Sequence, residues 1–157
     1  MKRGDDEFEH SLEMHLPMIK YVFSDNTGEN GRAPPKIVPI IVGNLTKEKE
    51  AEFGALLAPY FARPDTLFLI SSDFCHWGQD FGYQPYENFF GQFADEYTPV
   101  WEFIFALDMS GLELIENMDA DAFHQYCEET ENTICGRHPI GILLAILAQA
   151  SSLGSTH

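Results

Sequence analysis

The sequence has few basic residues, no long apolar run and no paired cysteine motif. Its 157 residues include 9 lysines and arginines against 25 aspartates and glutamates, which gives a formal net charge of −16. A chain this acidic lacks the basic surface to which nucleic acids and anionic membranes bind, so we expect neither as a partner. The simplest interpretation of the acidity is solubility.

Signals for export or membrane insertion are missing as well. The first residues, MKRGDDEFEHS, contain no apolar stretch of the secretory type. The most apolar run, residues 142–150, is too short to cross a membrane. The three cysteines are odd in number and form no disulfide-rich pattern. We therefore expect a reduced, intracellular protein in the cytoplasm, with the nucleus as a second location.

The chain does contain enough apolar residues for one compact domain, since 45% are hydrophobic and 13% aromatic. Helical spacing or composition predicts helices over 10–23, 46–62, 88–107, 110–117, 120–130 and 139–150. In the second of these, the apolar stripe expected to face the core comprises Phe53, Leu56, Leu57, Tyr60 and Phe61. The runs 37–43 and 66–72 are typical of buried strands. This order predicts an α/β fold, and because two strands make too small a sheet, we expect strands to be missing at its ends.

The stretch SSDFCHWG (71–78) follows the second expected strand and carries a carboxylate and an imidazole. In α/β sheets, ligands bind beyond the C-terminal ends of the strands. Asp73 and His76 lie three residues apart, so the carboxylate could orient an imidazole that moves protons. The alternative, favoured by spacing alone, is that Asp73 caps the turn and His76 packs against Trp77.

A second stretch, NTICGRHP (132–139), precedes the last expected helix. Cys135 would lie just before the helix N-terminus, where partial positive charge favours the thiolate, the form that binds metals. Gly136 allows close approach of the backbone to a ligand, and Arg137 offers a planar pair of donors for a carboxylate or phosphate. A buried, inert cysteine with Arg137 in a surface ion pair fits the pattern equally well.

A third stretch, EHSLEMHLP (9–17), carries Glu9, His10 and His15. Its two histidines are five residues apart, which is not the spacing of the H-E-x-x-H zinc motif. A helix start with Glu9 near the positive end is the plainer interpretation. A structural zinc site is also disfavoured, because no C-x-x-C pair is present.

Together, EHSLEMHLP, SSDFCHWGQ (71–79) and NTICGRHPIG (132–141) resemble three signature stretches of the Memo family, named for mediating ErbB-driven cell motility. IVPIIVGNL (37–45) is similar to a strand of that family. The resemblance runs from about residue 5 to about residue 148 and is weakest over 80–105.

The resemblance implies a fold like that of LigB-type class III extradiol dioxygenases, which use non-haem iron. It also implies a pocket that holds iron or copper through two histidines and a cysteine. Cys135 matches that cysteine, and His76 matches a proton-transfer histidine in the same pocket. Asp73 would act with His76. The residues expected to line or adjoin the pocket are Glu9, His10, Trp77, Arg137 and His138.

The family's two histidine ligands belong to segments upstream of EHSLEMHLP. We therefore expect residues 1–157 to form one partial Memo-like domain, without N- and C-terminal strands, that binds no metal alone. The implied function is a non-haem metal pocket with a role in redox and cell-motility signalling, inactive in this piece. Whether it catalyses a reaction is left open. The alternative is a signalling adaptor that binds a phosphotyrosine peptide or a small-molecule ligand, with Arg137 contacting the phosphate.

Overall fold

The computed structural model describes residues 10–24 and 35–154. They belong to two compact units, residues 1–41 and residues 42–157, and each unit is described by itself. In the first unit, the 3-10 turn η1 (Glu13–His15) leads into helix α2 (Leu16–Ser24). This agrees with the helix predicted over 10–23. Pro17 is the second residue of α2, where a missing N–H costs nothing. The predicted site residue Glu9 lies outside the described residues.

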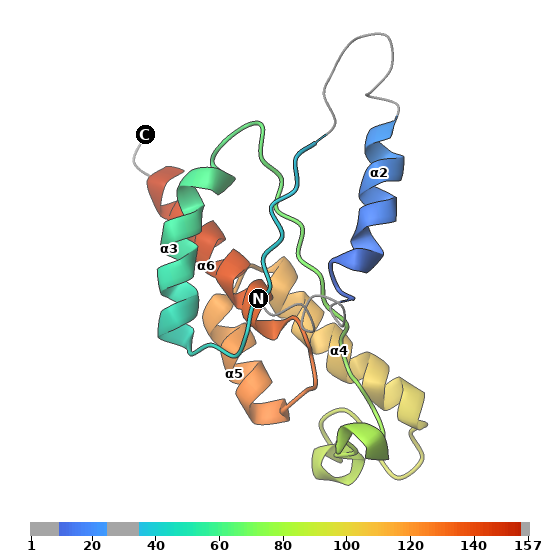
Figure 1. Ribbon diagram of the computed structural model, residues 1–157. Helices are drawn as coiled ribbons and strands as arrows, with labels where there is room; N and C mark the ends of the chain where they lie inside the picture. The colour runs from blue at the N-terminus through green and yellow to red at the C-terminus, as the bar shows by residue number, and fades with distance from the viewer. Residues whose placement is uncertain (1–9, 25–34, 155–157) are drawn as a thin grey trace. The chain divides into compact units, whose positions relative to one another are not determined.

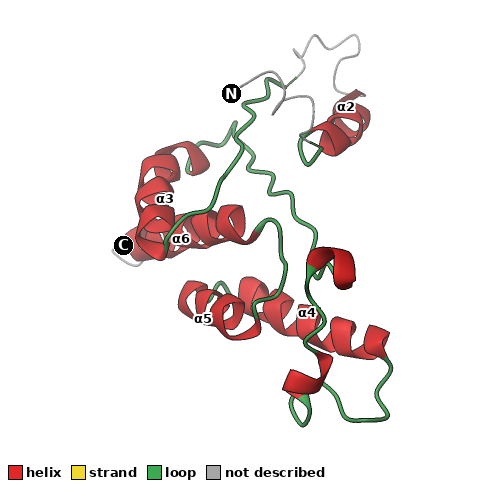
Figure 2. Cartoon of the chain, turned by 60° about the horizontal axis from the view of Figure 1, so that its bottom comes forward, coloured by secondary structure: helices red, strands yellow, loops and turns green. Residues whose placement is uncertain are grey.

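The second unit is built from helices joined by long irregular runs (Figure 1). Helix α3 packs on α6, α6 also contacts α5, and α5 packs on α4. Figure 2 shows the same helices from below, with α5 beside α4. The helices and 3-10 turns of the second unit are α3 (Lys47–Phe61), η3 (Gln79–Phe81), η4 (Tyr86–Phe89), α4 (Val100–Glu116), α5 (Ala120–Thr130) and α6 (Arg137–Gly154).

The predicted α/β fold, a partial LigB/Memo-like sheet flanked by helices, is wrong for the described residues. Neither 37–43 nor 66–72 forms a strand, and the only bridges found in the described part are two isolated ones. Both runs are uncoiled, and no backbone hydrogen bond is found for residues 67–71 among the described residues. The apolar and β-branched residues of the two runs favour an extended backbone. A sheet also needs a neighbouring strand, and the described residues supply none.

The helix predictions are mostly confirmed, with two errors. Helices α3, α5 and α6 form where the spacing predicts them, and Thr46 and Asp119 cap α3 and α5 by accepting backbone N–H groups of Lys49 and Ala122. The two helices predicted over 88–107 and 110–117 are instead one helix, α4. The aromatic stretch before it is a loop with one 3-10 turn.

The face by which α3 packs differs from the predicted one. Phe53, Leu56 and Tyr60 are exposed, whereas the buried positions of α3 are Glu50 and Gly54. Gly54 allows the close approach, because a Cβ there would lie 2.7 Å from the Cβ of Ala145 in α6. Three of the five stripe residues therefore face solvent, while Leu57 and Phe61 are half-buried. The fully buried positions of the helix are a small residue and a carboxylate.

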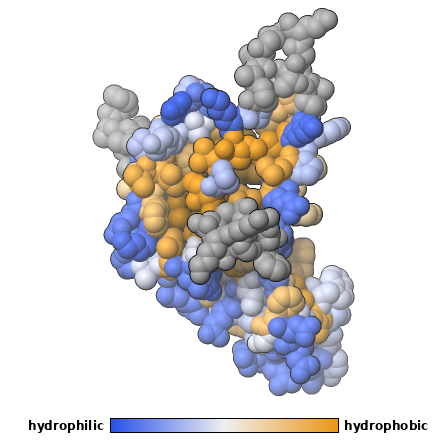
Figure 3. All heavy atoms as spheres, in the orientation of Figure 1, coloured by the Kyte–Doolittle hydropathy of each residue, from blue (hydrophilic) through white to orange (hydrophobic). Residues whose placement is uncertain are grey.

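The core of the second unit centres on Phe103 and Leu107 of α4, both fully buried. Phe103 is ringed by aromatic side chains from the loops before α4, with ring centroids 5.5 to 6.3 Å away. These neighbours are Trp77, Tyr86, Phe89 and Phe93. Apolar side chains also reach the surface, as the space-filling view shows (Figure 3). None of the helices within 10–24 and 35–154 is long and apolar enough to span a membrane.

Replacing Gly54 by valine is expected to lower the free energy of unfolding by about 1–3 kcal/mol, because the side chain forces α3 away from α6. Urea denaturation measures this loss. Ala55→Val is the control, since Ala55 is exposed on the same helix and valine there introduces a β-branched side chain without a clash. Equal losses for the two variants would contradict the packing described.

Candidate functional site

Two irregular segments form the site. The hydrogen bonds between them join residues that are 57 to 64 positions apart in the sequence. The first, residues 71–77, is here called the Asp73 segment and follows the uncoiled run after α3. The second, residues 131–136, is the Cys135 loop between α5 and α6. Glu131 has a left-handed backbone with φ of 49°, which ends α5 and turns the chain into this loop.

Three hydrogen bonds, each donated by a backbone N–H, join the two segments directly. The Asp73 N–H donates to Cys135 Sγ at 3.1 Å, and the Cys135 N–H donates to the Asp73 carbonyl at 3.2 Å. The Gly136 N–H donates to Ser72 Oγ at 3.0 Å. A Cβ at Gly136 would lie 2.6 Å from that oxygen and 2.7 Å from the Ser71 carbonyl. Glycine is therefore required where the two segments meet. The close approach to a ligand that the sequence suggested for Gly136 stays a prediction.

Thr133 fixes His76 through three hydrogen bonds. Its Oγ1 accepts the His76 N–H at 2.6 Å and donates to the His76 carbonyl at 3.0 Å. The Thr133 carbonyl lies 2.7 Å from His76 Nδ1. A carbonyl oxygen only accepts, so Nδ1 must carry the proton. In the neutral ring, Nε2 is then left with its lone pair free, the arrangement usual for a histidine that binds a metal.

Asp73, His76 and Cys135 thus form a cluster of three different donor groups. One ligand atom from each lies within 4.8 Å of the others. His76 Nε2 is 3.9 Å from Asp73 Oδ2. The Asp73 side chain is 75% exposed, that of His76 is 26% exposed, and Cys135 is an exposed free thiol. Among the residues the structure describes, this is the one grouping of three or more such donors.

The Asp108 carboxylate of α4 binds both segments. Asp108 accepts the Cys75 N–H at 3.2 Å and the Asn132 Nδ2–H at 2.9 Å. Asn132 is fully buried and also donates to the Tyr126 hydroxyl at 2.8 Å. Burial, with the nearby Asp108 carboxylate, raises the pKa of the Cys75 thiol to about 11. Cys75 is therefore a neutral, structural thiol near neutral pH.

The other predicted pocket residues are not members of the three-donor cluster. Trp77 packs edge-on against Phe103 in the aromatic core. His138 Nδ1 bonds the buried Glu50 of α3 at 2.6 Å, and Arg137 Nε donates to His138 Nε2 at 3.3 Å. His10 is exposed and belongs to the first unit. Their predicted roles remain predictions.

Several residues that hold the site could not be singled out from the sequence, namely Ser72, Asp108, Asn132 and Thr133. Thr133 and Asn132 belong to the NTICGRH stretch, so their motif was recognised but not their role. Asp108 gave no signal, because a single acid on a helix looks solvent-exposed until the loop that it binds is placed. Glu50 was missed for the same reason.

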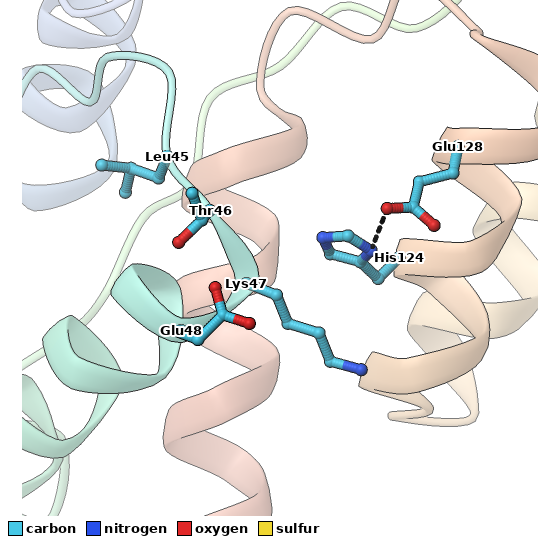
Figure 4. A pocket seen from close by; sticks show the side chains of 6 residues that line it. All are labelled: Leu45, Thr46, Lys47, Glu48, His124 and Glu128. Carbon is cyan, nitrogen blue, oxygen red and sulfur yellow. Dashed lines mark ion pairs between the residues drawn. The ribbon is translucent and has the colours of Figure 1, made fainter.

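A separate hollow of about 430 Å³ lies between the start of α3 and α5 (Figure 4). Three of its charged or titratable groups are in ion pairs: His124 with Glu128 at 3.5 Å, and Lys47 with Asp121 at 2.6 Å. Its lining includes none of the three clustered donors. The hollow therefore offers no comparable chemistry.

Comparison with known proteins gives one consistent result. A sequence model described as Memo-like protein matches residues 1–156. Curated relatives include Protein MEMO1 of Danio rerio, 44% identical over 98% of this chain, and Protein MEMO1 of Homo sapiens, 42% identical over 98%. Protein memo-1 homolog of Caenorhabditis elegans is 41% identical over 92% of the chain and 37% of its own length. The chain spans about half, 48%, of the first two relatives.

Alkylation of the folded protein with iodoacetamide is expected to label Cys135 at least tenfold faster than Cys75 and Cys127. Burial raises the pKa of both other thiols to about 11 from 9.0, so at about pH 8 their thiolate fraction is about 100-fold below that of an ordinary thiol. Labelling of these two should rise as the pH passes from 9 towards 11. Peptide mass spectrometry reads each site.

Labelling in denaturant is the control, because the three rates should then converge. Similar rates at all three thiols in the folded protein would contradict the burial of Cys75 and Cys127.

Proposed function

The chain belongs to the Memo-like protein family, and we propose that it binds a transition metal through Asp73, His76 and Cys135. The observation that supports this is the spacing of their donor atoms, all within 4.8 Å of one another. We include in the proposal the redox and cell-motility signalling role that the family resemblance implies, carried out in the cytoplasm.

The donor set fits iron or copper. Thiolate, imidazole and carboxylate together suit first-row transition metals rather than magnesium or calcium. Two metal–ligand bonds of about 2.0–2.3 Å each span up to about 4.5 Å. Small rotations of the exposed Asp73 and Cys135 side chains would therefore bring all three donors into range.

The protein's own groups prepare this site before any ion arrives. The Thr133 carbonyl keeps the proton on Nδ1 of His76, which leaves Nε2 as a ligand atom. The Asp73 N–H donates to Cys135 Sγ, which supports a negative charge on sulfur. The Asp73 carboxylate, exposed beside Nε2, can also accept a proton from a bound molecule. A bound iron or copper ion would supply one-electron chemistry and Lewis acidity.

The proposal modifies the expectation that residues 1–157 bind no metal alone. That expectation counted Cys135 as the chain's only ligand and assigned the two histidine ligands to upstream segments. Asp73 and His76 lie close to the thiol, so the cluster found in the described residues offers three donors instead of one. Metal content distinguishes the two views.

Adding Co(II) to the reduced protein without oxygen should give about one bound ion per chain, with a sulfur-to-cobalt absorption band from Cys135. Cys135→Ser should lose both the band and the bound ion. Absorption spectroscopy and elemental analysis after gel filtration measure them, and Fe(II) repeats the test with a metal expected for the family.

Cys127→Ser is the matched control, because Cys127 is a half-buried free thiol outside the donor cluster. Equal metal content in the wild type and in Cys135→Ser would overturn the proposal. So would loss of the metal in Cys127→Ser alone.

Thr133→Val tests the positioning of His76. Valine keeps the shape of threonine but forms neither side-chain hydrogen bond to His76, so Co(II) affinity should fall about 10–100-fold. Calorimetric titration measures the affinity. Thr66→Val, at an exposed threonine outside the site, should leave it unchanged, and equal affinities for wild type and Thr133→Val would contradict the role of Thr133.

A second hypothesis, binding of a phosphotyrosine peptide, has one supporting observation. Arg137 is exposed at the first residue of α6, and no carboxylate among the described residues forms an ion pair with it. Its remaining N–H groups could contact phosphate. Metal-free protein that binds such a peptide, and loses it in Arg137→Gln, would favour this hypothesis. The net charge of −16 opposes it.

A further inference from the structure

Helix α4 carries large apolar side chains on the face opposite to the core. Its inner face is buried through Phe103, Leu107 and Gly111, with Gly111 packed against the Tyr126 ring of α5. The outer face presents three side chains four residues apart, Trp101, Phe105 and Met109. They are 67%, 62% and 37% exposed, respectively. We call these three residues the α4 outer face.

The α4 outer face differs from the scattered apolar residues found on most surfaces. Its members span residues 101–109 of one helix, eight steps of about 1.5 Å or about 12 Å along the axis. Aromatic residues and methionine are enriched at protein interfaces, and tryptophan in particular carries binding energy there. A row of this composition is typical of a surface that a partner covers.

Charge near this row has a single sign. Glu113 and Glu116 are exposed further along the same side of α4, and Glu102 is exposed next to Trp101. None of these three carboxylates forms an ion pair within the described part of the chain. No lysine or arginine occurs between Arg63 and Arg137, although acidic residues recur throughout that stretch.

We propose that the α4 outer face binds a basic amphipathic helix of another protein. Apolar side chains of such a helix would cover Phe105 and Met109, while its lysines or arginines would meet the unpaired glutamates. A cation could also stack on the exposed Trp101 ring. Methionine adapts its shape to a range of apolar partners.

The same charges disfavour the other occupants. A second copy of this chain also carries −16, so two copies repel each other before they touch. Anionic membranes and nucleic acids carry the same sign of charge. A basic amphipathic helix supplies both apolar side chains for the α4 outer face and positive charge for the glutamates around it.

The test is a titration of the chain with a fluorescently labelled helical peptide that carries leucines on one face and lysines on the other. Fluorescence anisotropy measures the binding. We expect saturable binding that weakens by at least tenfold in Trp101→Ala/Phe105→Ala and falls with added salt. A peptide of the same pattern with glutamate for lysine should not bind. Leu56→Ala, at an exposed leucine on α3, is the matched control and should bind like the wild type.

Three results would overturn the proposal. The first is equal binding by Trp101→Ala/Phe105→Ala and wild type, which would indicate unspecific attraction to an acidic protein. The second is equal binding of the glutamate peptide. The third is self-association in analytical ultracentrifugation that Trp101→Ala abolishes, which would make a second copy the occupant. The metal site plays no part in this test, so its failure leaves that proposal untouched.

Discussion

The hydrogen bonds between the Asp73 segment and the Cys135 loop are the constraint on which the site depends. Neither segment has regular secondary structure, so neither holds its shape alone. The bonds from Thr133 to His76 and between Asp73 and Cys135 tie them together, each contributing about 0.5–1.5 kcal/mol. The Asp108 carboxylate of α4 accepts a hydrogen bond from each segment, from the Cys75 N–H and from Asn132 Nδ2. The three donors are therefore set by a network anchored in the helical core.

This arrangement combines rigid backbone with accessible side chains. The backbone groups of both segments are bonded to each other, whereas the Asp73 and Cys135 side chains reach solvent. The His76 side chain is both held and accessible, because Nδ1 is hydrogen-bonded to the Thr133 carbonyl while the ring is partly exposed. Such a combination suits a ligand set, because the donors need little reorganisation and an incoming ion is not obstructed. The α4 outer face lies on the same helix as Asp108 but on its exposed side.

Local pattern predicted the helices better than it predicted the fold. Spacing and composition found α3, α5 and α6, and two of the signature stretches carry Asp73, His76 and Cys135, whose roles stay predictions. The sheet failed because an apolar run indicates only that a strand could form, while pairing depends on distant chain. The packing face of α3 failed because Gly54 and Glu50 have no apolar signal. Thr133 and Asp108 escaped notice because their partners lie 57 and 33 residues away.

The most direct measurement is the tautomer of His76 in the metal-free protein, by long-range ¹H–¹⁵N NMR of the labelled imidazole. In the neutral ring, the proton should be on Nδ1, and Nε2 should show the chemical shift of an unprotonated nitrogen. That result would mean that the Thr133 carbonyl aims the ligand atom at Asp73 and Cys135. A proton on Nε2, or rapid exchange between both nitrogens, would contradict the prepared site.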